Sequence, residues 1–148
     1  MAHVKKQIRD AIKTRLTGLT TTGTNVFDSR VYDLQASELP ALMIFPGDET
    51  VEYLTMGRGS RPKEHIFEIG IDAMAVGTSG LADLLDLIEK EIVIAMSSDV
   101  TFGALAKDSF FVSSENIISG EGDKTSGVRR IVYSVDFQTI ETDPETAL

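Results

Sequence analysis

The residues from 65 to 74 alternate between two kinds of side chain, and this pattern constrains the fold more than any other. The even positions are mixed and include Glu68 and Asp72. The odd positions are His65, Phe67, Ile69, Ile71 and Ala73. A period of two predicts a long strand that turns one face to a hydrophobic core. Such a chain must therefore supply further strands beside it and a layer to cover that face.

Two segments instead repeat their apolar residues every three or four positions, which is typical of amphipathic helices. The first consists of Val4, Ile8, Ala11, Ile12 and Leu16, and Gly18 favours its end. The second consists of Leu81, Leu84, Leu85, Ile88, Ile92, Ala95 and Met96. Thr78 or Ser79 is predicted to cap the second helix, and Asp86 with Lys90 should form an ion pair on it.

Three more strands are predicted. The apolar run Ala41–Phe45 should form a central strand stopped by Pro46 and Gly47, with a short strand possible at Val51–Leu54. Alternation predicts strands over Phe110–Ile118 and Val128–Ile140, joined by a loop at 119–127. The order of helix, strands, helix, strands predicts an α+β fold, with a mostly antiparallel sheet packed against two main helices.

The chain is expected to be a single domain over residues 1–148, because no linker or internal repeat divides it. Its polar end, about residues 141–148, carries Pro144 and is predicted to be a flexible tail. The longest dense apolar run, Ile92–Met96, is far too short to span a bilayer. A soluble protein with no signal peptide and no membrane partner is therefore expected.

The charge and the lack of cysteine exclude several classes of function. The net charge of −9 opposes general binding to phosphate backbones, so direct or sequence-specific nucleic-acid binding is not expected. The absence of cysteine excludes thiolate metal sites and cysteine nucleophiles and fits a reducing compartment. An acidic balance serves solubility, or it favours a basic partner.

The sequence contains no motif for a catalytic, cofactor or metal site, and we expect a protein that is not an enzyme. His3 and His65 each lack a second ligand at metal-binding spacing. The carboxylates of Asp83, Asp86 and Glu89 are typical of a solvated helix face. The stretch Gly120–Thr125 lacks the spacing of a phosphate loop and is predicted to join two strands. A small enzyme or ligand-binding domain using Glu68, Asp72 or Asp136 remains an alternative.

The loop from Thr55 to Lys63 is the most basic part of the chain. It contains Arg58, Arg61 and Lys63, together with Gly57 and Pro62. It is expected to be exposed, either as solubilising charge or as a contact loop for an acidic neighbour. Because the rest of the protein is acidic, that neighbour could be another copy of the chain, associating head to tail into a ring.

The first fifty residues resemble a known family. A helix, a polar connection, Phe27-Asp28-Ser29-Arg30 and then Leu39-Pro40-Ala41 leading into an apolar strand are similar to the opening of tail-terminator proteins of long-tailed bacteriophages, the minor tail protein U group. The matching positions are Phe27, Asp28, Arg30 and Pro40. The chain departs from the family in the loop Met56–Lys63 and in the loop at 119–127.

The resemblance implies an α+β subunit of the virion that is assembled in the host cytoplasm. It implies a hexameric ring that caps the tail tube, ends tail polymerisation and offers a docking surface to the head-tail connector or neck protein. Its partners would be its own copies, the tail tube protein and the connector. The predicted contact residues are Arg30, Arg58, Arg61 and Lys63. A neck or head-completion adaptor is the alternative within the same particle.

Overall fold

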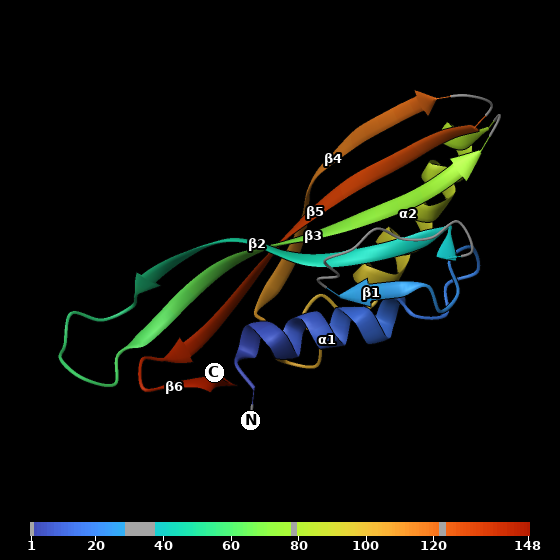
Figure 1. Ribbon diagram of the computed structural model, residues 1–148. Coiled ribbons are helices and arrows are strands. Elements are labelled where there is room, and N and C mark those ends of the chain that lie inside the picture. The colour runs from blue at the N-terminus through green and yellow to red at the C-terminus, as the bar shows by residue number, and fades with distance from the viewer. Residues whose placement is uncertain (1, 29–37, 78–79, 122–123) are drawn as a thin grey trace.

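The computed structural model describes residues 2–28, 38–77, 80–121 and 124–148, and Figure 1 shows their arrangement. These residues form two helices and six strands. In chain order they are α1 (Val4–Leu16), β1 (Val26–Asp28), β2 (Ala41–Tyr53), β3 (Pro62–Gly77), α2 (Leu81–Ser97), β4 (Asp108–Glu121), β5 (Lys124–Ile140) and β6 (Asp143–Ala147).

All six described strands belong to one sheet, in the order β1-β2-β3-β5-β4, with β6 added beside the end of β5. Only β1 and β2 are parallel, and the other pairs are antiparallel. The central ladder joins β3 to β5 from Pro62 opposite Ile140 to Gly77 opposite Thr125. The predicted mostly antiparallel sheet is therefore confirmed, with long strands that run well past the two helices (Figure 1).

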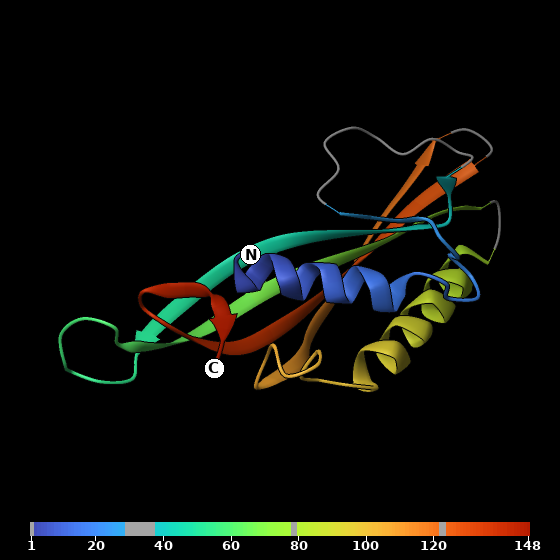
Figure 2. The ribbon, with the colours of Figure 1, turned by 90° about the horizontal axis from the view of Figure 1, so that it is seen from below.

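Both helices lie on one face of the sheet, as the view in Figure 2 shows. Each buries the stripe predicted from its spacing: Val4, Ile8, Ile12 and Leu16 on α1, and Leu81, Leu85, Ile88, Ile92 and Met96 on α2. They pack against the inward residues of β3 and β5, which include Phe67, Ile69, Ile71, Ile131, Val135 and Phe137. One continuous core results, and the opposite face of the sheet carries no helix (Figure 2).

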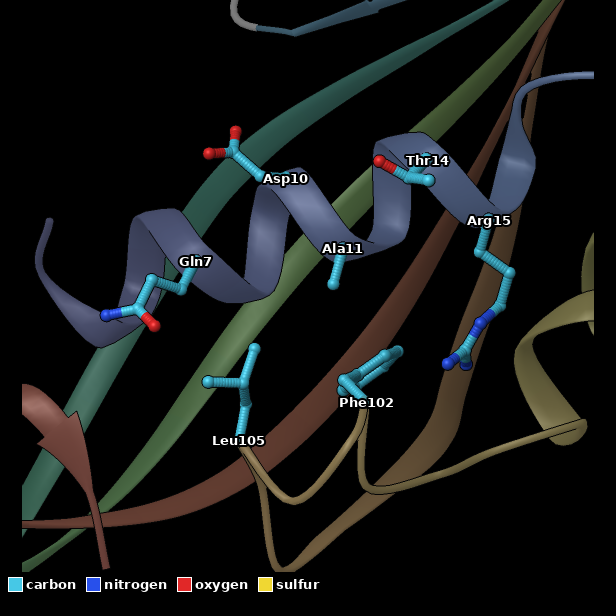
Figure 3. A pocket seen from close by; sticks show the side chains of 7 residues that line it. All are labelled: Gln7, Asp10, Ala11, Thr14, Arg15, Phe102 and Leu105. Carbon is cyan, nitrogen blue, oxygen red and sulfur yellow. The ribbon is translucent and has the colours of Figure 1, made fainter.

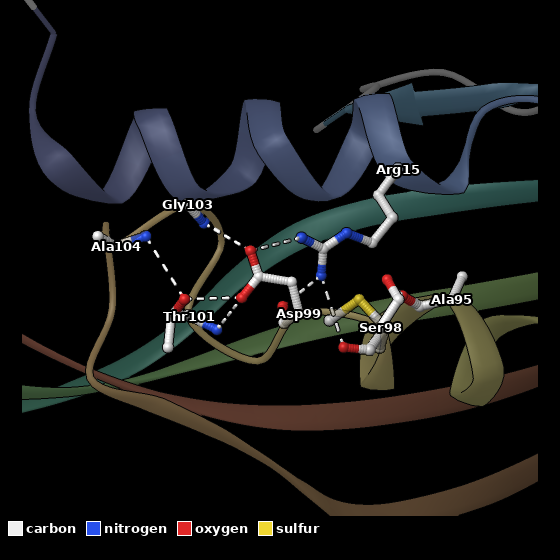
Figure 4. Close-up of polar contacts among 8 residues, drawn as sticks. Arg15, Ala95, Ser98, Asp99, Thr101, Gly103 and Ala104 are labelled. Carbon is white, nitrogen blue, oxygen red and sulfur yellow. Dashed lines mark hydrogen bonds and ion pairs between the residues drawn. The ribbon is translucent and has the colours of Figure 1, made fainter.

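An arginine from α1 fastens the end of α2 and the loop after it (Figure 4). Arg15 Nη1 donates to the carbonyl oxygens of Asp99, at 2.6 Å, and of Met96, at 3.5 Å. It thereby supplies the cation that the last turn of α2 lacks. The Asp99 carboxylate accepts hydrogen bonds from Thr101 and from the Gly103 amide, and these bonds lower the pKa of Asp99 to about 2.

The helix-free face has its own close packing at Gly70. The ring of Phe45 lies over this glycine, where a Cβ would approach Phe45 Cζ to 2.2 Å. The guanidinium of Arg130 lies over the Phe45 ring, 4.9 Å from its centroid, and donates two hydrogen bonds to Asp72, of 3.0 and 3.1 Å. Gly70 therefore serves a close approach, which explains a glycine in the middle of the longest pattern in the sequence.

The structure corrects four expectations. β2 does not stop at Pro46 and Gly47 but continues to Tyr53, with a register shift between Pro46 and Glu49. Such an irregularity lets a strand pass a proline that cannot donate to the ladder. The predicted loop at 119–127 is mostly strand, because β5 pairs with β3 as far as Thr125 and with β4 as far as Lys124.

The other two concern α2, namely its ion pair and the residue that precedes its first turn. Asp86 pairs with Arg129 of β5 rather than with Lys90, and α2 follows Gly80, whereas Thr78 and Ser79 lie outside the described residues. The segment for which a flexible tail was predicted forms β6, which pairs with β5, and Gln7 donates to the carbonyl oxygen of Glu145. The flexibility of residues 141–148 in solution stays a prediction.

Candidate assembly surface

A hairpin projects from the helix-covered part of the sheet, and we call it the arm. It consists of residues 49–66, the second half of β2, the connecting loop and the start of β3, and it extends to the left in Figure 1. Its apolar side chains are exposed: Tyr53 by 50%, Leu54 by 45% and Met56 by 101%. Burying such side chains in a contact with another molecule would be favourable, so the tip of the arm is a candidate binding surface.

The structure places Arg58, Arg61 and Lys63 in the arm, and the three side chains differ in their surroundings. Arg58 is exposed at the tip. Arg61 donates two hydrogen bonds to the carboxylate of Glu141, at 2.9 and 3.1 Å, and its guanidinium stacks on Tyr53 at 4.2 Å. Lys63 lies in β3 opposite Tyr53. The fourth predicted contact residue, Arg30, lies outside the described residues.

The Arg61–Glu141 pair ties the tip to the end of β5. The backbone strengthens the tie, because the Glu141 amide donates to the Arg61 carbonyl oxygen at 2.8 Å. The hydrogen bonds from Arg61 lower the pKa of Glu141, and the bond to Glu141 raises the pKa of Arg61. Arg61 is therefore paired within the chain, whereas Arg58 is exposed at the tip.

The base of the arm contains a buried histidine. His65 is 4% exposed, and its ring stacks on Phe137 with centroids 4.4 Å apart. Its Nε2 is 2.8 Å from the hydroxyl oxygen of Thr139, and its Nδ1 lies 3.4 Å from Glu49 Oε2 without hydrogen-bond geometry. Burial lowers the pKa of His65, with Glu49 opposing that shift. These contacts belong to packing at the foot of the arm, in line with the structural interpretation of His65.

The sequence did not identify the second exposed feature, the edge formed by β4. Within the described residues β4 pairs only with β5, so its other side is open. Four apolar side chains on it are about half exposed: Phe110 by 55%, Phe111 by 45%, Val112 by 52% and Ile117 by 47%. The adjacent apolar run 110–112 breaks the alternation of a half-buried strand and could have signalled a strand with two apolar faces.

A shallow groove of about 670 Å³ separates α1 from the loop after α2 (Figure 3). Its walls are the side chains of Gln7, Asp10, Ala11, Thr14, Arg15, Phe102 and Leu105. Arg15 already serves the carbonyl oxygens of α2, and Phe102 is buried beneath it with its ring 4.8 Å from the guanidinium. Two of the side chains that line the groove therefore hold α1 and the loop after α2 together. The groove lining contains no pair of groups arranged for acid–base chemistry.

The carboxylates considered for an enzyme, Glu68, Asp72 and Asp136, do not line this groove. Asp72 is paired with Arg130, while Asp136 raises the pKa of Glu64 through its negative charge. Among residues 2–28, 38–77, 80–121 and 124–148, no group of three His, Asp or Glu side chains could hold a metal ion. None of the described helices is long and apolar enough to cross a membrane.

Comparisons with known proteins find similarity among solved structures. No protein-family model and no curated protein matches the chain. A chain from the solved structure "Virion of native gene transfer agent (GTA) particle" aligns with 90% of this chain and 92% of its own length, at 17% sequence identity and a TM-score of 0.39. The likeness concerns the arrangement of the chain in space, and what that protein does in its particle is a property of that protein.

Proposed function

We propose that this protein is a structural subunit of a phage virion that forms a ring on the end of the tail tube. The ring ends tail polymerisation and provides the surface on which the head-tail connector or neck protein docks. The observation that carries the proposal is the arm, a hairpin that leaves the core and exposes Tyr53, Leu54, Met56 and Arg58 at its tip. A subunit that acted alone would gain nothing from keeping these side chains in water.

The proposal includes no catalytic residue, cofactor or metal. The buried polar contacts of the described residues fasten elements to one another, as Arg15 does for α1 and α2. The family resemblance of Phe27, Asp28, Arg30 and Pro40 supports the tail-terminating role, and the arm offers a physical means of association. Six copies, the tail tube protein and the connector are the partners, and the host cytoplasm is the place of assembly.

Light scattering on the full-length chain tests the ring. The mass should rise to about six copies, either with protein concentration or when tail tube protein is added, and high salt should weaken the association by screening charge. A monomer at all concentrations, at low and high salt, and with the tube protein would contradict the proposal. In particles that lack the protein, overlong tails indicate tail termination, and tails of normal length without heads indicate the neck adaptor.

The role of the basic tip is tested by reversing one charge. Arg58→Glu should weaken association at least tenfold, because it places a carboxylate where we expect an acidic neighbour. Lys13→Glu is the matched control, since Lys13 is exposed on α1 and the net charge changes equally. If the two variants assemble alike and tail length is unchanged, Arg58 is not a contact residue.

A further inference from the structure

In the described part of the sheet, β2 of the arm and β4 each have a side on which no described strand pairs, and they lie toward opposite ends of the strand order. At one end, β1 pairs with β2 only from Leu42 to Ile44, so β2 from Glu49 to Tyr53 has β3 on one side and no described strand on the other. At the other end, β4 pairs with β5 alone. Each edge presents unpaired backbone amides and carbonyls, which can pair with a strand of another molecule.

The directions of the strands determine how a second copy could fit. β2, β3, β5 and β4 are successively antiparallel, so β4 runs opposite to β2. A second copy placed beside the first in the same orientation brings its β2 next to β4 as an antiparallel neighbour. The contact joins two different surfaces, so each added copy leaves a free edge for the next, and the series ends when it closes into a ring.

The two open edges are also displaced along the strands. Thr50 lies opposite Ile66, Ile66 opposite Asp136, and Asp136 opposite Asp108, the first residue of β4. The open part of β2 therefore extends from this level toward the tip of the arm, while β4 extends the other way. Copies can overlap these edges only by staggering, and a stagger between neighbours is what closing a sheet into a barrel requires.

The charge of the arm tip complements β4, and both edges expose apolar side chains. The open stretch of β2 itself contains Glu49 and Glu52, and the exposed cation Arg58 lies beyond it at the tip, whereas β4 includes Asp108 and Glu115 and no lysine or arginine. Both edges also expose apolar side chains: Tyr53, Leu54 and Met56 on the arm, and Phe110, Phe111, Val112 and Ile117 on β4. A second copy of this chain therefore satisfies the backbone and the apolar surface of either edge, and its Arg58 can lie beside the acidic β4.

We infer that neighbouring copies join by strand addition, with β2 of the arm of one copy pairing antiparallel to β4 of the next. This inference rests on the proposed ring and identifies the contact that builds it. The sheets of all copies then form one continuous barrel, and the arm tip with Arg58 reaches the acidic edge of its neighbour.

Cysteine cross-linking on the full-length chain tests this contact, because the chain has no cysteine of its own. Thr50 and Ser113 are exposed on the two edges and lie opposite Ile66 and Val132. The double variant Thr50→Cys with Ser113→Cys should give a ladder of cross-linked species with a short bismaleimide, at least tenfold stronger than either single variant. The control pairs Thr50→Cys with Ala82→Cys, since Ala82 is exposed on α2 away from the edge.

The outcomes separate this contact from the ring itself. A ladder from the double variant alone, ending at the mass found by light scattering, supports strand addition. A ring without the ladder, an equal ladder from the control, or dimers from Thr50→Cys alone would overturn the inference and leave the proposed function standing. Failure to assemble with or without tail tube protein would overturn both.

A second variant tests the same edge without cross-linking. Ser114→Lys adds a long charged side chain to the exposed edge of β4, a substitution that blocks strand pairing between molecules. Association should weaken at least tenfold, while the circular dichroism spectrum stays that of the native protein. Unchanged association would contradict the inference.

Discussion

The helix-covered half of the sheet and the arm consist of the same strands, yet their side chains are buried to very different extents. In β3 behind the helices, Phe67, Ile69 and Ile71 are at most 1% exposed. In β2 of the arm, Val51 and Tyr53 are 39% and 50% exposed. The alternating pattern continues through both regions. Packing against α1 and α2, rather than the pattern itself, therefore decides which apolar side chains are buried.

The polar groups of the two regions differ in the same way. In the helix-covered half, Arg15 and Asp99 are each held by several bonds within the chain. At the tip of the arm, Arg61 is held by Glu141, whereas Arg58 is exposed. Arg15 and Asp99 of the helix-covered half are satisfied within the chain, whereas the exposed Arg58 can bind the partner that we propose.

The largest effect is expected from removing a side chain that the helices cover. Ile88→Ala should lower the free energy of unfolding by about 2–5 kcal/mol, because Ile88 is fully buried and its truncation leaves a cavity. Ile94→Ala on the same helix is the matched control, and with 62% exposure it should change stability by about 0.5 kcal/mol or less. Urea unfolding measures both, and equal losses would contradict the division into covered and uncovered regions.

Local patterns were sufficient to predict both helices and parts of β2, β3, β4 and β5, but not β1 or β6. The spacing of Val4, Ile8 and Ile12 predicted α1, and the alternation from His65 to Ala73 predicted the strand with one buried face, because side-chain period follows backbone geometry directly. The strand ends were less predictable. Pro46 and Gly127 break strands in isolation, but pairing with β3 overrides that tendency at both places.

Of the two candidate contact surfaces, the sequence predicted the arm but not the edge of β4. The charge of Arg58, Arg61 and Lys63 pointed to the arm, but the pairing of Arg61 with Glu141 joins residues far apart in the sequence and depends on the fold. The open edge of β4 depends on strand order, which no local pattern determines, since β5 rather than β4 lies beside β3. Arg129, buried among Asp86, Glu89 and Asn116, was missed for the same reason.

A smaller effect is expected at the boundary between the two regions, where His65 is buried. Replacing it by glutamine should cost about 1–3 kcal/mol near neutral pH, through the lost stacking on Phe137 and the altered contact with Thr139. The pKa of His65 is lowered from 6.5, so below that pH the unfolded chain binds a proton that the folded protein does not. The stability from His65 is present above pH 6.5 and is lost as pH falls toward the lowered pKa.

The measurement for His65 is urea unfolding of the native protein and of His65→Gln across this range of pH. The difference between them should narrow as the pH falls below 6.5, and a constant difference would contradict a neutral buried histidine. His3 also has a lowered pKa, chiefly through burial, and it is retained in both proteins.

The next prediction is a weaker pH dependence of the free energy of unfolding, caused by Asp99 in the loop after α2. Its pKa is lowered from 3.8 to about 2, chiefly by the hydrogen bond from Thr101. The unfolded chain therefore takes up a proton first as pH falls, and the stability supplied by the carboxylate is lost between pH 3.8 and about 2. The stability difference between the native protein and Asp99→Asn should shrink over this interval, because all other carboxylates are common to both. An unchanged difference would show that the charge on Asp99 does not fasten the loop.

The smallest effect on stability is expected at the tip of the arm. A substitution there tests most directly whether the arm differs from the helix-covered half of the sheet. Met56 is fully exposed, so Met56→Ser removes no packing within the subunit and should change the free energy of unfolding by about 0.5 kcal/mol or less. The same substitution should weaken association, because the methionine loses its apolar contact with the neighbouring copy. Unfolding in urea and light scattering on one sample measure the two effects. A loss of stability without a loss of association would mean that Met56 serves the fold of the subunit. A contact residue should instead show weaker association with unchanged stability.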